Sequence, residues 1–111
     1  MLDFLGIEFN HMYYMCMCIL DPKGVAVDIK NLLDHDTPSY NIYVVDTSTS
    51  IKNIILNFSH TDVQKIIDSL QIKLEPYIDK LTVGIGGVYA SIGDIHLSYS
   101  EAIAALDYRF L

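Results

Sequence analysis

The stretch from Tyr40 to Phe58, which reads YNIYVVDTSTSIKNIILNF, decides the fold. Two runs rich in β-branched and aromatic residues, Tyr40–Asp46 and Ile51–Phe58, flank the short polar segment Thr47–Ser50. A short polar connection between two such runs is typical of a β-hairpin, because these residue types favour extended backbone. We therefore predict two neighbouring antiparallel strands here, and the other elements are placed around them.

The segment before the hairpin predicts a central strand and a helix. Met12–Leu20 is continuously apolar, which is typical of a strand covered on both faces. The turn Asp21–Gly24 ends this strand, with proline at its second position and glycine at its fourth. Apolar residues recur at helical spacing over Val25–Leu33, which predicts a short helix. The polar residues Asp34–Ser39 are predicted to form a loop.

The segment after the hairpin predicts a second helix, a strand and a third helix. Thr61–Gln64 matches a capping box, and the apolar stripe behind it reaches Leu74. Leu81–Ile85 alternates like a strand, and Gly86-Gly87 is predicted to mark its departure from the sheet. A second capping box, Ser98–Glu101, predicts where the last helix begins.

This order of elements predicts an α+β fold. Strand, helix, strand, strand, helix, strand is the βαββαβ succession of a ferredoxin-like sandwich, an antiparallel sheet with helices on one face. The 111 residues, 51% of them hydrophobic, favour one domain over residues 1–111. The predicted core consists of Met15, Met17, Ile19, Val44, Ile55, Ile66, Leu70, Val83, Ile85 and Leu106.

The charge balance excludes several classes of partner. Fourteen acidic residues face seven basic ones, for a formal charge of −7. Nucleic-acid binding rests on clustered Lys and Arg, and anionic membrane surfaces select the same residues, so both are disfavoured. The longest apolar run has nine residues where a membrane span needs about 20, and no signal peptide is visible. We expect a cytoplasmic protein.

The residues that often carry chemistry favour structural roles here. Cys16 and Cys18 would point the same way on a strand, too close for an ordinary disulfide, and are interpreted as small buried hydrophobes. The glycines of Gly84–Gly87 superficially resemble a phosphate loop, but no lysine or helix start follows. Close backbone approach or a bulge is the favoured interpretation. The histidines His11, His35, His60 and His96 are predicted to lie in solvated loops. His35 in the sequence Asp34-His35-Asp36 lacks converging metal ligands.

The C-terminal third resembles a known family. Leu81–Gly87 followed by Ser98–Phe110 is similar to the "GiG … SyxeAxxAlxyrf" segment of the degenerate GGDEF-like domain in large AraC-family transcriptional regulators of Gram-positive bacteria. PucR-type regulators have a similar segment. The resemblance places the domain between a sensory part and a C-terminal pair of helix-turn-helix units. The sensory part is either the receiver of a two-component system or a membrane-anchored module. The implied fold is that of nucleotidyl cyclases.

The resemblance also implies that catalysis has been lost. Active diguanylate cyclases carry GG(D/E)EF on the hairpin, whereas Asp46–Ile51 has no glycine and no acidic pair. Those enzymes also place a metal-binding Asp at the end of strand one, where Asp21 stands. Arg109 provides no RxxD product-binding site, because Phe110 and Leu111 follow it. We expect no catalytic, cofactor or metal residues beyond the relic candidates Asp21 and Asp46, and no cofactor.

Three functions follow as hypotheses. The first is a non-catalytic signal-relay domain whose partners are the neighbouring sensor and DNA-binding domains. The second is a divergent cyclase or nucleotide sensor that uses Asp21 and Asp46. The third, a free-standing interaction domain, applies if the native gene ends near Leu111. Cyclase-like domains add a strand after the last helix. We therefore expect that strand's place to be empty or filled by the N-terminal segment or a neighbouring chain, which would make a homodimer.

Overall fold

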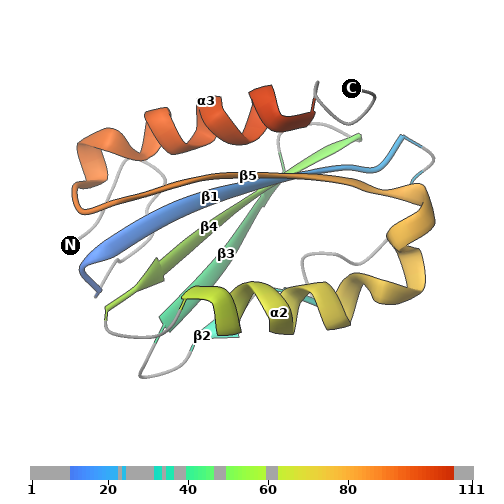
Figure 1. The fold of residues 1–111 in the computed structure, drawn as a ribbon, viewed down its shortest axis with the longest axis horizontal. Helices are drawn as coiled ribbons and strands as arrows, with labels where there is room; N and C mark the ends of the chain where they lie inside the picture. Colours follow the sequence, from blue (N-terminus) through green and yellow to red (C-terminus); the bar gives the residue numbers. More distant parts are fainter. Residues whose placement is uncertain are drawn as a thin grey trace.

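The computed structural model describes residues 11–22, 24, 32–33, 35–36, 40–46, 50–59 and 63–106. Its strands are β1 (Tyr13–Leu20), β2 (His35–Asp36), β3 (Tyr40–Asp46), β4 (Ile51–Phe58) and β5 (Thr82–Tyr89). Its helices are α2 (Val63–Leu74) and α3 (Ile95–Leu106), with 3₁₀ turns η1 (Glu75–Lys80) and η2 (Ile92–Asp94). The strands form one sheet in the order β2-β3-β4-β1-β5, and every neighbouring pair is antiparallel (Figure 1).

The hairpin that decided the fold is present with the predicted bounds. β3 and β4 pair from Tyr40 opposite Phe58 to Asp46 opposite Lys52. β1 lies between β4 and β5, as its continuous apolar sequence predicted. The order β3-β4-β1-β5 and the helix between β4 and β5 are those of a ferredoxin-like sandwich. The predicted fold class is confirmed.

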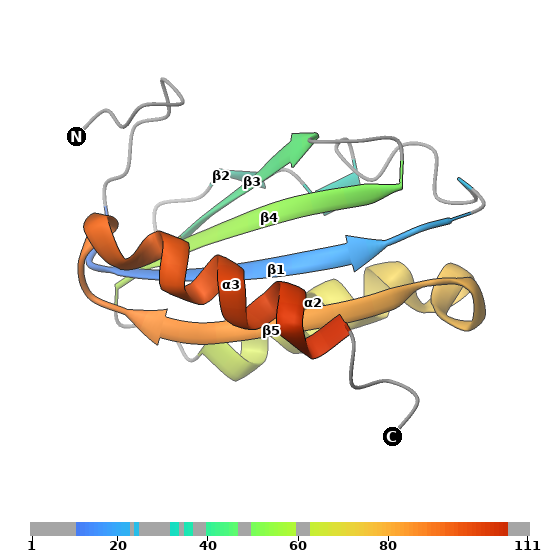
Figure 2. The same cartoon turned by 90° about the horizontal axis from the view of Figure 1, so that it is seen from above.

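The two described α-helices cover opposite faces of the sheet (Figures 1 and 2). On the face of α2, Ile66, Leu70 and Leu74 join a buried cluster with Met17 of β1 and Ile54 of β4. The α3 face is packed by smaller clusters, which include Tyr14, Cys16, Cys18, Ile55, Ala102 and Leu106. The expectation of helices on one face is therefore wrong for α3. Because β1 is apolar on both faces, both faces must be covered.

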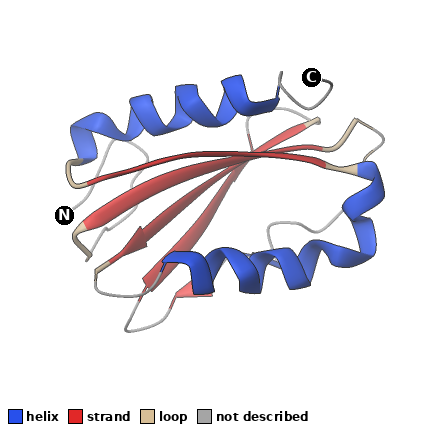
Figure 3. Cartoon of the chain, in the orientation of Figure 1, coloured by secondary structure: helices blue, strands red, loops and turns tan. Residues whose placement is uncertain are grey.

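The largest differences from the predicted elements are at the end of β5, at the start of α3 and in β2; Figure 3 shows the helices and strands as the structure has them. β5 continues to Tyr89, four residues beyond the predicted end at Ile85. α3 begins at Ile95, three residues before the predicted cap at Ser98. His35 and Asp36 form β2 on β3 instead of a loop, because a two-residue strand is too short to leave a periodic signal. Of the predicted helix Val25–Leu33, Leu32 and Leu33 are helical, and the rest lies outside the described residues.

Most of the predicted core is buried. Met15, Met17, Ile19, Val44, Ile55, Ile66, Leu70 and Leu106 are all buried. Val83 is half-buried, and Ile85 is 41% exposed, so the prediction for Ile85 is wrong. Both residues lie on β5, which pairs with β1 and with no other described strand. Side chains on an edge strand have packing partners on one flank only.

The turn after β1 has the predicted form. The Gly24 N–H donates to the Asp21 carbonyl oxygen at 3.2 Å, and Gly24 adopts a left-handed φ of 62° that suits glycine. The predicted cap Thr61, the N-terminal segment and residues 107–111 lie outside the described residues. Across the described ranges, no helix is both long enough and apolar enough to span a membrane.

Candidate functional site

A bulge in β5 is the main irregularity of the sheet. Met17 pairs with Ile85, but Met15 pairs with Val88, so the register shifts by one residue between them. Gly86 and Gly87 together stand opposite Cys16 alone. A bulge of this kind leaves backbone groups that the ladder does not pair, and these groups need other partners.

Two glycines of β5 let α3 lie directly on the strand. A Cβ on Gly84 would lie 2.1 Å from the carbonyl oxygen of Ala102, and one on Gly86 would lie 2.0 Å from that of Ser98. Real Cβ atoms do not approach backbone so closely, so any larger residue would push the helix away. Ala102 is small and fully buried at the same contact. Small residues on both elements therefore set the distance between α3 and the sheet.

The Ser98 hydroxyl links α3 to both strands at the bulge. The Cys16 N–H donates to Ser98 Oγ at 2.8 Å, and Ser98 Oγ donates to the Gly87 carbonyl oxygen at 2.7 Å. Ser98 is fully buried. One side chain thus provides hydrogen-bond partners for two backbone groups of β1 and β5. The predicted capping role of Ser98 is wrong, because it lies in the second turn of α3 and bonds across to the sheet.

Glu101, one helical turn after Ser98 on α3, also bonds to the bulge. Its Oε1 accepts the Gly87 N–H at 3.0 Å and the Tyr89 hydroxyl at 2.8 Å. The hydrogen bond to Glu101 raises the pKa of Tyr89, and the charges of Glu101 and Asp94 act in the same direction. Glu101 therefore binds Gly87 and Tyr89 to the helix. We call Ser98, Glu101 and the bulge that they hold the α3 clamp.

The two thiols lie under α3 on the same face of β1, as predicted. Cys16 Sγ lies 3.7 Å from the Ile95 carbonyl oxygen, and the Cys18 thiol donates to Asn53 Oδ1 at 3.1 Å. Both cysteines are free and buried. Burial raises the pKa of each thiol to about 11. A thiol of that pKa is protonated at neutral pH and is therefore a poor nucleophile and metal ligand.

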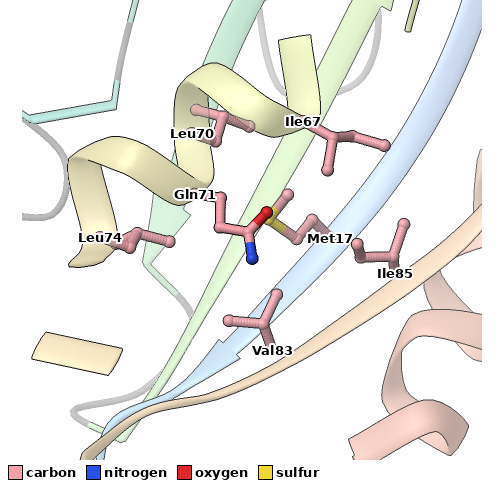
Figure 4. Close-up of a pocket in the computed structure, with 7 residues that line it drawn as sticks. All are labelled: Met17, Ile67, Leu70, Gln71, Leu74, Val83 and Ile85. Carbon is pink, nitrogen blue, oxygen red and sulfur yellow. The ribbon is translucent and has the colours of Figure 1, made fainter. Parts of the chain in front are cut away.

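A cleft of about 170 Å³ opens between α2 and the sheet (Figure 4). Its lining is apolar except for one amide and comes from three elements. The lining residues are Met17 of β1, Ile67, Leu70, Gln71 and Leu74 of α2, and Val83 and Ile85 of β5. The cleft runs along the side of α2 that faces β5, where Val83 and Ile85 are incompletely covered. The sequence did not predict it, because Ile85 was assigned to the core.

A family model decides what this chain is related to. The model of the GGDEF-like domain matches residues 2–108. The chain belongs to the GGDEF-like domain family. No curated protein and no solved structure matches the chain. The fold of the GGDEF-like domain agrees with this membership, since it is an antiparallel sheet with helices packed on it.

The segment that carries the resemblance forms the α3 clamp in this GGDEF-like domain. Gly84 and Gly86 allow the close approach, Gly87 completes the bulge, and Ser98 and Glu101 bond to it. Both parts of the favoured interpretation of the glycines, close approach and bulge, are therefore confirmed. In the GGDEF-like domain these glycines contact α3 instead of shaping a loop that opens a helix.

The relic candidates Asp21 and Asp46 lie at one end of the sheet. Asp21 directly follows β1 and is 2% exposed, and its N–H donates to the Ser50 carbonyl oxygen at 2.7 Å. Asp46 ends β3 and stands opposite Lys52 in the register. β4 runs between the two positions, which places their backbones about 10 Å apart from the usual strand spacing. The fold therefore brings both acids to the same end of the sheet. Asp21 follows β1 and Asp46 ends β3, and these two strands lie on opposite sides of β4.

In the part of the chain that the structure describes, the other side chains that could bind a metal are not clustered. Within the described ranges, no three His, Cys, Asp or Glu side chains gather as a metal site would require. His11 Nδ1 is hydrogen-bonded to Ser59 Oγ at 3.1 Å, and the backbone N–H of His11 donates to Asn57 Oδ1. His96 lies in the first turn of α3 and contacts the Gly93 carbonyl oxygen at 2.8 Å. His11 lies in the bend before β1, as the loop prediction has it, and is half-buried. The loop prediction is wrong for His96, which is exposed but helical, and for His35, which lies in β2, whereas His60 lies outside the described residues.

Proposed function

We propose that this GGDEF-like domain is a non-catalytic signal-relay domain of an AraC-family transcriptional regulator. It would couple a sensory module to a helix-turn-helix DNA-binding module, both outside this chain, in the cytoplasm of a Gram-positive bacterium. Its partners are those neighbouring domains, and it binds no nucleotide, metal or DNA. The resemblance of Ser98–Phe110 to the corresponding segment of such regulators supports this host.

The sequence of the β3–β4 connection carries the proposal. Thr47-Ser48-Thr49-Ser50 offers hydroxyl groups but no glycine pair and no carboxylate pair. A cyclase of this fold needs glycines so that the backbone can approach the nucleotide, and acids to hold Mg²⁺ on its phosphates. Without that counter-charge, the negative charge on a transferring phosphoryl group is not stabilised.

The neighbourhood of Asp21 supports the same proposal. Asp21 is 2% exposed, and its backbone N–H donates to the Ser50 carbonyl oxygen. A carboxylate that holds Mg²⁺ and a nucleotide must be reachable from solvent, because Mg²⁺ keeps several of its water ligands. Asp21 is therefore better suited to holding the end of β1 against the start of β4.

Calorimetry with GTP and Mg²⁺ tests the proposal directly. We expect no saturable heat at 100 µM domain, and no turnover of GTP with Mg²⁺ or Mn²⁺ when products are followed by chromatography. An active diguanylate cyclase under the same buffer serves as the positive control. Insertion of Gly-Gly-Asp-Glu-Phe into the hairpin is also expected to leave the domain inactive, since the residues after Asp21 differ from those of active enzymes.

The alternative is a divergent nucleotide-binding domain or sensor that uses Asp21 and Asp46. It is favoured by one observation, that both acids come to the same end of the sheet. Micromolar GTP binding that Asp21→Asn and Asp46→Asn each weaken at least tenfold would establish this alternative. Binding that both variants leave unchanged would contradict both proposals.

A relay role is tested in the complete regulator. Removal of residues 1–111 in frame is expected to keep binding to the target promoter and to abolish its response to the inducing signal. The matched variant keeps the domain and carries Asp46→Asn, which should respond normally because no catalytic step depends on that acid. Loss of the response in this variant would favour the nucleotide-dependent alternative.

A further inference from the structure

The chain just before β1 is held by the side chain of Asn57 on β4. Asn57 Oδ1 accepts the His11 N–H at 3.0 Å. Asn57 Nδ2 donates to the His11 carbonyl oxygen at 3.0 Å and to the Tyr13 carbonyl oxygen at 2.9 Å. Asn57 is fully buried. Its amide therefore bonds both backbone polar groups of His11, as a neighbouring strand would.

The side chain of His11 binds the same end of β4. His11 Nδ1 is hydrogen-bonded to Ser59 Oγ at 3.1 Å, and Ser59 directly follows Phe58, the last residue of β4. His11 and Ser59 are both half-buried. The backbone and the ring of His11 are thus both tied to the end of one strand. We call His11, Asn57 and Ser59 the entry anchor.

The entry anchor lies on the face of the sheet that α3 covers. Asn57 pairs with Tyr14 across β4 and β1, and directly paired residues of an antiparallel sheet share a face. Tyr14 belongs to the buried cluster on which Ile92 of η2 and Ile95 of α3 pack. β1 and α3 also begin at the same end of the sheet (Figure 2). The anchored end of β1 and the start of α3 are therefore joined through one cluster.

β1 extends this connection to the α3 clamp. Cys16 lies two residues after Tyr14, and its N–H donates to the buried Ser98 Oγ at 2.8 Å. Close-packed interiors have low compressibility and transmit strain. A short length of one strand, held by hydrogen bonds at His11 and again at Cys16, therefore connects the chain before β1 to α3.

We infer that the entry anchor is the place where the signal of the sensory module enters this domain. The inference rests on the proposed relay role, and it gives that role an input site. A displacement of the chain before His11 is passed to β4 by Asn57 and to α3 by way of β1. Asn57 and Ser59 are positioning residues in this scheme, because they act by holding His11.

Hydrogen exchange of the ¹⁵N-labelled domain measures the anchor itself. Asn57→Asp removes both hydrogen bonds that the amide donates, so the His11 amide should exchange about tenfold faster or more. Ser59→Ala should raise the same rate about threefold, the effect of one hydrogen bond. Ile54→Val is the matched control, because Ile54 lies on the same strand but in the cluster under α2, and it should leave the rate unchanged. Unchanged exchange in Asn57→Asp would overturn the inference.

The complete regulator measures the input role. The readout is the ratio of promoter activity with and without the inducing signal, and promoter binding is measured beside it. Asn57→Asp and Ser59→Ala should each lower this ratio about threefold or more and leave promoter binding intact. Ile54→Val should change neither quantity, which separates an input role from a general loss of stability. If Asn57→Asp fails to fold, Ser59→Ala decides, since it removes a single half-buried hydroxyl.

Removal of residues 1–111 distinguishes failure of this inference from failure of the relay role. A response that is lost on removal but normal in Ser59→Ala, with faster exchange of the His11 amide, would overturn the entry anchor and leave the relay role standing. A response that survives removal of the domain would contradict the relay role and, with it, the input site.

Discussion

Ser98 shows how much one side chain contributes to this fold. Its hydroxyl accepts the Cys16 N–H and donates to the Gly87 carbonyl oxygen, and it is fully buried. Ser98→Ala would leave the buried Cys16 N–H and the part-buried Gly87 carbonyl oxygen without this partner, which costs about 1 to 3 kcal/mol of unfolding free energy. We expect this loss in urea denaturation.

Ser100→Ala is the matched control for Ser98→Ala. It makes the same chemical change on the exposed side of the same helix, so any effect of helix propensity is shared. We expect Ser100→Ala to alter the free energy of unfolding by less than about 0.5 kcal/mol. Equal losses in the two variants would contradict the role assigned to the Ser98 hydroxyl.

The contact of Gly86 with α3 gives a second prediction. Gly86→Ala would place a methyl group 2.0 Å from the Ser98 carbonyl oxygen, so the helix must move. We expect a loss of about 3 kcal/mol or more by thermal or chemical denaturation. Gly93→Ala is the control, because its nearest neighbour would be Ser91 Oγ at 3.6 Å, an ordinary contact. A Gly86→Ala variant as stable as Gly93→Ala would show that α3 does not rest on β5.

The buried thiols predict slow chemical modification. In the folded protein Cys16 and Cys18 have a pKa of about 11, against 9.0 for the free group. At pH 8 we expect slow reaction with an aromatic disulfide reagent, and complete reaction of both thiols in 6 M guanidinium chloride. Because folding raises these pKa values, the protonated thiols stabilise the fold below pH 9. That contribution is lost as the pH rises from 9 to 11. Rapid reaction of the native protein would contradict this burial.

Among elements, the apolar strands could be predicted and the α3 contact could not. The bounds of β3 and β4 followed from local composition, because β-branched runs and a polar turn are local signals. The end of β5 was missed because glycine pairs usually end strands, whereas here they allow the close approach of α3. The start of α3 was missed because a serine followed three residues later by glutamate has the pattern of a cap. Only the fold shows that both side chains bond to a bulge.

Among the candidate sites too, some positions could be predicted from the sequence and others could not. The position of Asp21 at the end of β1 was predictable, because the strand and its turn are local. The cleft beside α2 was not predictable, since it depends on how far α2 extends over β5. The buried Asn57 was also missed, although its amide donates to the carbonyl oxygens of His11 and Tyr13. Asparagine in a strand is depleted, and no sequence pattern indicates which partners will satisfy it.

The difference between a central and an edge strand predicts unequal effects of one substitution. Ile19 of β1 and Ile85 of β5 have the same side chain and lie on the same face of the sheet, the face that α2 covers. Ile19 is fully buried, whereas Ile85 is 41% exposed. Ile19→Ala should cost about 2 to 5 kcal/mol of unfolding free energy, and Ile85→Ala under about 1 kcal/mol. Urea denaturation of the two variants measures both. Similar losses would mean that Ile85 is buried in solution.

For the whole molecule, the charge of −7 predicts no affinity for DNA. Binding to a duplex gains from counterion release when Lys and Arg neutralise phosphates, and an acidic domain is repelled instead. We expect no change in the anisotropy of a labelled 30-base-pair duplex with up to 50 µM domain at 50 mM salt. Binding that weakens linearly with the logarithm of salt concentration would contradict the assignment of DNA recognition to another domain.

The α3 clamp has a mechanical consequence, since it fixes one half of a helix more firmly than the other. Ser98 and Glu101 bond to the bulge near the start of α3, whereas Ala102 and Leu106 hold the later turns by apolar contact. A force applied to the end of α3 would therefore peel the helix backwards from Leu106, one turn at a time, and meet its main resistance at Glu101. Beyond Glu101 the force is transmitted to β5 and, through the hydrogen bond between Ser98 and Cys16, to β1 in the middle of the sheet.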